Sequence, residues 1–198
     1  MEKIIIKFAD ATDLPLVGFI KDAIIHASEQ KGTGIAVRSS EYITGKILEG
    51  KAIIAKTETG IWAGFCYIES WGHNRFVANS GLIVDENFRG RGLAKAIKSK
   101  AFELSQKLFP GAKLFGITTS LAVMKINSEL GYKPVTISEL TDDEEFWKGC
   151  QTCPYYDILV RTKRSHCLCT AMLLDPDQKK PAKTLSDSAE AKTMHSHK

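Results

Sequence analysis

The stretch "NFRGRGLA" at residues 87–94 decides the fold. Arg89 and Arg91 flank its first glycine, a second glycine follows at position 92, and an apolar-periodic segment begins directly after it. A strand-like run at 75–84 precedes the stretch, which is therefore a strand-to-helix turn. Glycine lets a ligand approach the main chain, and the helix dipole and both arginines attract negative charge. The turn predicts a pyrophosphate site, although glycines at such a turn can also serve tight packing alone.

The segments on either side of this turn predict an α/β fold without internal repeats. The predicted strands are 3–9, 51–57, 61–70, 75–84, 113–120 and 155–161, and helices are expected from Thr12, Glu41, Leu93 and residue 121. Residues 58–60 close a hairpin between the second and third strands. A dinucleotide-binding fold needs its glycine turn in a first βαβ unit, whereas this turn follows an antiparallel run in mid-chain.

Composition and charge fit one soluble globular domain. The chain has 198 residues, of which 43% are hydrophobic and 25% charged, enough for a sizeable core. The formal net charge is +4, and residues 176–198 hold five lysines against three acids, so no nucleic-acid partner is indicated. No apolar run reaches the ~18 residues that span a bilayer, and acidic residues come too early for a signal peptide. We expect a cytoplasmic protein without a membrane partner; the oligomeric state stays open, with a homodimer allowed.

The turn resembles the acetyl-CoA-binding motif of the GNAT N-acetyltransferases. Arg89, Gly92 and Ala94 fit the family's R-x-x-G-x-G/A pattern, and "LGYKPV" at 130–135 is similar to the Gly-Phe segment after its last helix. The resemblance implies a central mixed, mostly antiparallel sheet flanked by helices over residues 1–174, with a cysteine-containing extension from about 163. Residues 175–198 are expected to form a disordered tail, because they offer too few apolar groups to fold. Its histidines, His195 and His197, are not expected to bind a specific metal.

The resemblance also implies which residues bind acetyl-CoA. Main-chain groups of Leu82, Ile83 and Val84 would contact the pantetheine arm and stabilise an oxyanion, because their strand is expected to splay from its neighbour. The turn itself would contribute a continuous set of residues: Arg89, Gly90, Arg91, Gly92, Leu93 and Ala94. The positions where many relatives carry an asparagine and a proton-donating tyrosine fall on Ser120 and Asn127 here. Asn127 cannot donate a proton at a useful pKa, so a tyrosine general acid is in doubt.

The general base is harder to assign. The attacking amine must lose a proton, and the ionisable groups expected nearest the cleft are Glu69, at the end of a strand, and His73, in the following loop. Neither signal is strong, because a lone histidine in a loop between strands is more often a surface residue. Tyr132 is expected in the core.

The prediction of the acceptor substrate depends on a weaker resemblance to the acetyltransferase domain of N-acetylglutamate synthases. The segment 37–56, "ITTS" at 117–120 and a late tyrosine-containing strand are similar to that group. In it, Arg38 would hold the carboxylate of an amino acid such as glutamate. Arg38 can equally be a solvated arginine before a helix. The predicted partner is a small-molecule amine.

The cysteines offer a second hypothesis. Cys150 and Cys153 form a C-x-x-C pair, and Cys167 and Cys169 a C-x-C pair, which together could supply four thiolates to a structural zinc. A C-x-x-C redox function and ordinary reduced thiols are the alternatives, and Cys66 is expected in the core. Two function classes therefore stand beside each other. One is an enzyme that transfers an acyl group from CoA to a small amine, a polyamine or a protein; the other is a regulatory or scaffold module that binds CoA or zinc without turnover.

Overall fold

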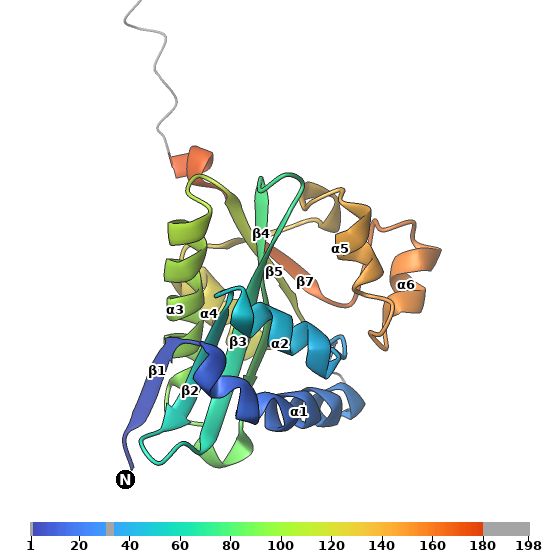
Figure 1. The fold of residues 1–198 in the computed structure, drawn as a ribbon. Helices are drawn as coiled ribbons and strands as arrows, with labels where there is room; N and C mark the ends of the chain where they lie inside the picture. The colour runs from blue at the N-terminus through green and yellow to red at the C-terminus, as the bar shows by residue number, and fades with distance from the viewer. Residues whose placement is uncertain (1, 31–33, 180–198) are drawn as a thin grey trace, which may run out of the picture.

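The computed structural model describes residues 2–30 and 34–179, and in them one mixed sheet forms the centre of the molecule (Figure 1). The strands lie in the order β1-β2-β3-β4-β5-β7-β6. Their bounds are β1 Ile4–Phe8, β2 Ala52–Thr57, β3 Trp62–Trp71, β4 Phe76–Val84, β5 Lys113–Thr118, β6 Lys133–Val135 and β7 Thr170–Leu174. Neighbours pair antiparallel except β4 and β5, which are parallel. This is the mixed, mostly antiparallel sheet that the sequence predicts.

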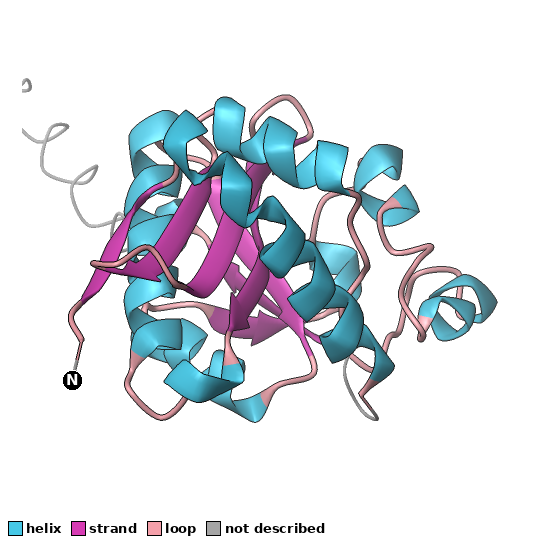
Figure 2. Cartoon of the chain, turned by 60° about the horizontal axis from the view of Figure 1, so that its bottom comes forward, coloured by secondary structure: helices cyan, strands magenta, loops and turns pink. Residues whose placement is uncertain are grey.

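Helices cover both faces of this sheet (Figures 1 and 2). The longer ones are α1 Val17–Glu29, α2 Ser40–Leu48, α3 Leu93–Leu108 and α4 Leu121–Glu129, followed by the short α5 Glu144–Lys148 and α6 Tyr156–Arg161. The apolar stripe of α3 packs on one face of β2, β3 and β4, whereas α1 and α2 pack on the other. Alternation along the strands supplies both faces, since Ile53 belongs to the first core cluster and Ile54 to the second. No helix of the described segments is long and apolar enough to cross a bilayer.

Two expectations about local structure are wrong. The first helical segment begins with the 3-10 turn Ala11–Leu16, and Asp10 caps it in place of Thr12, since its carboxylate accepts from the Thr12 N–H at 2.9 Å. The segment 155–161, expected as a strand, forms α6, which buries Leu159 and leaves Val160 exposed. The late strand is instead β7, from the segment expected as an extension, and it lies between β5 and β6. The expected tail lies outside the described residues from 180 onward.

Strands β4 and β5 pair over only three residues before they separate. Phe76 pairs with Lys113, and the last pair is Ala78 with Phe115, although β4 continues to Val84 and β5 to Thr118. A bulge accompanies the separation: the β3–β4 register shifts between Phe65 and Tyr67. Because a bulge bends its strand and increases the twist, it turns the second half of β4 away from β5. The splay that the resemblance implied is present.

Candidate active site

One cavity of about 530 Å³ occupies the opening between β4 and β5. At one end it reaches Arg89 and Ala94, beside the start of α3, and at the other it reaches Arg38. The second wall is built by residues 34–38 and by the segment 146–169, which carries α5 and α6. A single continuous cavity therefore connects the predicted pyrophosphate turn with the predicted acceptor residue.

The turn before α3 has the backbone of an anion site. Gly90 and Gly92 have φ angles of 76° and 75°, in the left-handed region that favours glycine. Gly92 caps α3 without a side-chain hydrogen bond, and the first turn of α3 contains no acidic residue, so the first N–H groups of the helix stay available. Arg89 lines the cavity and donates from Nε to the Val84 carbonyl at 3.3 Å. Arg91 instead stacks over the Phe88 ring at 5.3 Å, and it does not line the cavity.

The second half of β4, which does not pair with β5, lines the middle of the site. Leu82, Ile83 and Val84 all line the cavity, as does the bulge residue Gly81. Gly81 has a φ of 64°, and a Cβ placed on it would lie 2.5 Å from the Tyr67 ring, so only glycine suits this position. The peptide groups of β4 beyond Ala78 have no partner on β5, and can therefore bind an extended ligand.

Helix α4 places both residues that the resemblance assigned to it. Ser120 caps the helix by accepting from the Val123 N–H at 3.4 Å, and it lines the cavity. Asn127 is buried at 1% exposure; its amide donates to the Met172 Sδ at 3.6 Å, while its Oδ1 has no partner among the described residues. Tyr132 is in the core, as expected, and donates to Asn79 Oδ1 at 2.9 Å.

Lysine 98 is a residue of the site that sequence reasoning missed. It lies on α3 at 1% exposure, yet it lines the cavity. Its Nζ approaches the Asn79 carbonyl at 3.5 Å. The sequence pattern could have identified it. Lys98 falls one position after Ile97 and three before Ala101, on the apolar stripe of α3, where a charged residue is unexpected. Gly81 was also missed, although an isolated glycine within a strand pattern is typical of a bulge.

Arg38 lies at the acceptor end. Its Nε donates to the Tyr67 hydroxyl at 3.1 Å, and its Nη1 donates to the carbonyls of Val37 at 3.2 Å and Gly149 at 3.1 Å. These bonds hold the guanidinium in place and leave Nη2 facing the wall near Gly149. Tyr67 is buried, and burial raises the pKa of its hydroxyl, so it stays protonated beside the cation.

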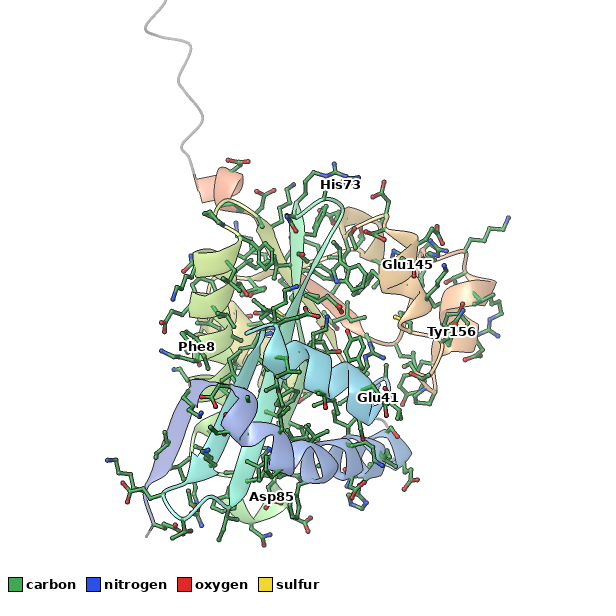
Figure 3. The ribbon with its side chains drawn as sticks, viewed as in Figure 1. Phe8, Glu41, His73, Asp85, Glu145 and Tyr156 are labelled. Carbon is green, nitrogen blue, oxygen red and sulfur yellow. The ribbon has the colours of Figure 1, made fainter. Side chains whose placement is uncertain are left out.

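The two candidate bases are placed away from the cavity. Glu69 accepts hydrogen bonds from the Tyr42 hydroxyl and the Lys46 ammonium, both on α2, and it does not line the cavity. His73 is exposed in the turn between β3 and β4, at the opposite end of β4 from Asp85 and the pyrophosphate turn (Figure 3). Among the described lining residues there is no aspartate, glutamate or histidine.

The four cysteines of the C-terminal segment, Cys150, Cys153, Cys167 and Cys169, all line the cavity wall. However, no three histidine, cysteine or acidic side chains of the described residues gather closely enough to hold a metal ion. The zinc hypothesis is therefore not supported, and the two pairs are separated by α6 instead of the expected strand. The thiols are free, and Cys66 is in the core as expected.

Comparison with known proteins identifies the fold. No protein-family model and no curated protein matches the sequence. Among solved structures, Rv2747 from Mycobacterium tuberculosis, in complex with CoA, is 16% identical with a TM-score of 0.62 over 86% of this chain and 98% of that chain. N-acetylglutamate synthase from Neisseria gonorrhoeae, with CoA and N-acetyl-glutamate, is 16% identical with a TM-score of 0.61 over 87% of this chain, but only 35% of that chain.

A third similar structure has a comparable length. A GNAT superfamily phosphinothricin acetyltransferase from Sinorhizobium meliloti, in complex with AcCoA, is 15% identical with a TM-score of 0.57 over 93% of this chain and 97% of that chain. At such low identity, these similarities establish the fold. The chain has the GNAT acetyltransferase fold, as the resemblance of the turn at 87–94 implied.

Proposed function

We propose that the protein is an acyl-CoA-dependent N-acetyltransferase that transfers an acetyl group to the amine of a small acceptor. The observation that carries this proposal is the continuous cavity, which joins an anion-binding helix start to an arginine through an opened pair of parallel strands. That arrangement suits a substrate with a pyrophosphate at one end and a reactive group near the middle. The structural neighbours in complex with CoA or AcCoA support it.

Different residues of the chain would bind different parts of acetyl-CoA. Arg89 and the free N–H groups of α3 would hold the pyrophosphate of acetyl-CoA, with Gly90 and Gly92 letting it approach the backbone. The peptide groups of Leu82, Ile83 and Val84 that do not pair with β3 would hold the pantetheine arm, since no β5 residue competes for them. Because no described carboxylate or imidazole lines the cavity, the acceptor amine would lose its proton to water before it attacks the thioester carbonyl.

An amino acid such as glutamate is the acceptor that we favour. The Arg38 guanidinium lines the cavity, and its three hydrogen bonds use Nε and Nη1 and leave Nη2 as the donor for a carboxylate. Two neighbours support this class: the Neisseria synthase was solved with N-acetyl-glutamate, and a diaminobutyrate acetyltransferase from Paenibacillus lautus with L-2,4-diaminobutyric acid.

Calorimetry with CoA, followed by a matrix of acyl-CoA donors and amine acceptors, tests the proposed function. Arg89→Ala should weaken CoA binding by about tenfold, the loss of one charge-assisted contact. Arg75→Ala is the matched control, because Arg75 is exposed just before β4, at the end opposite the turn. No CoA binding by the wild type, or equal effects of the two substitutions, would refute the site.

A second candidate function is a CoA-binding regulatory module without turnover. The observation that favours it is the lack of an acidic or histidine base among the described lining residues, together with Asn127 at the position of the expected tyrosine. The matrix separates the two functions, since a module would bind CoA and release no thiol with any amino acid, polyamine or peptide acceptor.

A further inference from the structure

Lys98 carries a buried charge that has no counterion. Its side chain is 1% exposed, and none of the ion pairs found among the described residues includes it. Its polar contacts are the Asn79 carbonyl at 3.5 Å, longer than an ordinary hydrogen bond, and the face of the Tyr132 ring, with Nζ 5.7 Å from the centroid. An ammonium buried this way costs free energy of folding, so the stability of the fold does not explain its presence.

The ammonium of Lys98 lies where β4 and β5 begin to separate. Asn79 is the first β4 residue without a partner on β5, and its carbonyl is the one that Nζ approaches. From the other strand, a Cβ placed on Gly116 would lie 3.7 Å from Nζ and 3.8 Å from the Asn127 amide nitrogen. All four residues line the cavity. Lys98 lies about 7.5 Å along α3 from Leu93, at 1.5 Å per residue, so it lies beyond the pyrophosphate turn.

Transfer of an acyl group from CoA needs a proton at this part of the cavity. When an amine attacks the thioester carbonyl, the C–N bond forms, the C–S bond breaks and the sulfur leaves as a thiolate. Asn127, which lies beside this point, has an amide group that cannot donate a proton at a useful pKa. Building on the function proposed above, we propose that Lys98 is the catalytic acid that protonates the leaving thiolate.

The proposed step balances with the groups that are present. The Lys98 ammonium gives one N–H proton to the sulfur and becomes a neutral amine, while the thiolate becomes the CoA thiol. The attacking nitrogen releases its own proton to water, and Lys98 regains a proton from water before the next turnover. Before the proton moves, the ammonium also stabilises the negative charge that grows on sulfur, because solvent screens the charge of the buried Lys98 only weakly.

The surroundings of Lys98 give it a suitable acidity. Burial lowers the pKa of Lys98 from 10.5 to about 8, and the Cys66 thiol on β3 opposes this shift. The other groups that face it are neutral: the Tyr132 phenol, whose pKa burial raises, and the amides of Asn79 and Asn127. An acid with such a pKa is protonated at neutral pH and still gives up its proton readily to a thiolate.

Bound CoA tests the proposal without turnover. The ultraviolet absorbance of the thiolate is titrated for CoA bound to the wild type, Lys98→Met and Lys98→Arg. If Lys98 contacts the sulfur, the wild type and Lys98→Arg should lower the pKa of the bound thiol, and Lys98→Met should raise it by at least one unit relative to the wild type. Equal thiol pKa values in all three proteins would overturn the assignment of Lys98 while leaving the CoA site intact. If no protein binds CoA, the proposed function itself is wrong.

Turnover gives the second measurement. Lys98→Met should lower kcat by about 100-fold or more with little change in the KM for acetyl-CoA, and Lys98→Arg should restore only part of it, since a guanidinium holds its proton too tightly. The wild-type rate should decline above pH 8, where Lys98 loses its proton, and this decline should be missing in Lys98→Met. If Lys98 were purely structural, the remaining activity of Lys98→Met would show the same decline above pH 8 as the wild type. That result would refute the proposal.

Discussion

At the scale of single residues, Lys98 offers a prediction about stability. Its folded pKa, about 8, lies below the ordinary 10.5, so the unfolded chain binds more protons between these values and stability rises with pH there. Below pH 8 the full cost of burying the charge is present. Lys98→Met should therefore raise the free energy of unfolding by about 3 kcal/mol at pH 7, and the gain should shrink toward pH 10. Urea denaturation at both pH values measures this; a less stable variant would mean that the ammonium supports the fold.

A second residue-scale prediction concerns the thiols of the cavity wall. A hydrogen bond from Cys169 lowers the pKa of Cys167 to about 6, whereas burial raises the pKa of Cys150 and of Cys66 to about 11. Because the thiolate is the reactive form, iodoacetamide at pH 7 should alkylate Cys167 first. Peptide mass spectrometry identifies the site, and the labelling rate should rise through pH 6. Faster labelling of Cys150 would contradict the hydrogen-bonded arrangement.

Much of the anion turn, but little of the acceptor wall, was predictable at this scale. Arg89, Gly90 and Gly92 could be read from the sequence because a glycine turn between a strand and a helix fixes its own backbone. Lys98 was not singled out, since its role depends on where β4 and β5 separate, which no local pattern encodes. Glu69 was expected beside the cleft, and no local pattern shows that its partners Tyr42 and Lys46 come from another element.

At the scale of elements, we predict that the bulge in β4 needs glycine at position 81. Gly81→Ala forces a left-handed φ on alanine and places its Cβ 2.5 Å from the Tyr67 ring. We expect a loss of about 2 to 4 kcal/mol in the free energy of unfolding, and weaker CoA binding even where the variant folds, since relief of the clash would alter the splay. Urea denaturation and calorimetry measure the two effects.

Gly18→Ala is the matched control for Gly81→Ala. Gly18 is exposed on α1, and a Cβ there meets nothing within 4 Å, so alanine should stabilise the helix by up to about 1 kcal/mol without affecting CoA. If both substitutions were tolerated equally, the bulge would not be needed for the cavity.

Element order was predictable up to about residue 130, but strand β6 at Lys133–Val135 was not predicted and the late strand was placed in the wrong segment. The types of the strands with alternating apolar residues and of helix α3 were predicted correctly. Each of these elements buries one face, so its apolar residues recur with the period of a strand or of a helix. The run 155–161 has tyrosines and β-branched residues typical of a strand, but β7 takes the place beside β5 and pairs with both β5 and β6. Tertiary contacts therefore outweigh the strand propensity of this segment, which forms α6 and buries Leu159 in the third core cluster.

At the scale of the whole molecule, the acceptor end is assembled from segments far apart in the sequence. Arg38 bonds the Gly149 carbonyl, and the Thr152 hydroxyl donates to the Val37 carbonyl at 3.2 Å, so the loop before α2 is tied to the segment after β6. The cavity exists because these two segments close over the splayed strands. Such a wall has no signal in any single window of sequence, which is why only Arg38 was predicted there.

This arrangement gives the final prediction, on acceptor choice. If the free Nη2 of Arg38 pairs with a carboxylate, Arg38→Ala should raise the KM for glutamate by about 10- to 100-fold, the loss of one charge-assisted hydrogen bond, while CoA affinity stays unchanged. An acceptor without the α-carboxylate should show no such penalty, because the removed guanidinium had nothing to pair with.

Tyr67→Phe separates recognition by Arg38 from its structural bonds. This variant removes the hydroxyl that accepts from Nε at 3.1 Å but keeps the guanidinium and the buried ring. It should therefore raise the KM for glutamate only a few-fold, less than Arg38→Ala does. Steady-state kinetics of both variants with both acceptors decide the matter. Equal penalties on the two acceptors would show that Arg38 serves to join the loop to the segment after β6, and that selection of the acceptor lies elsewhere in the wall.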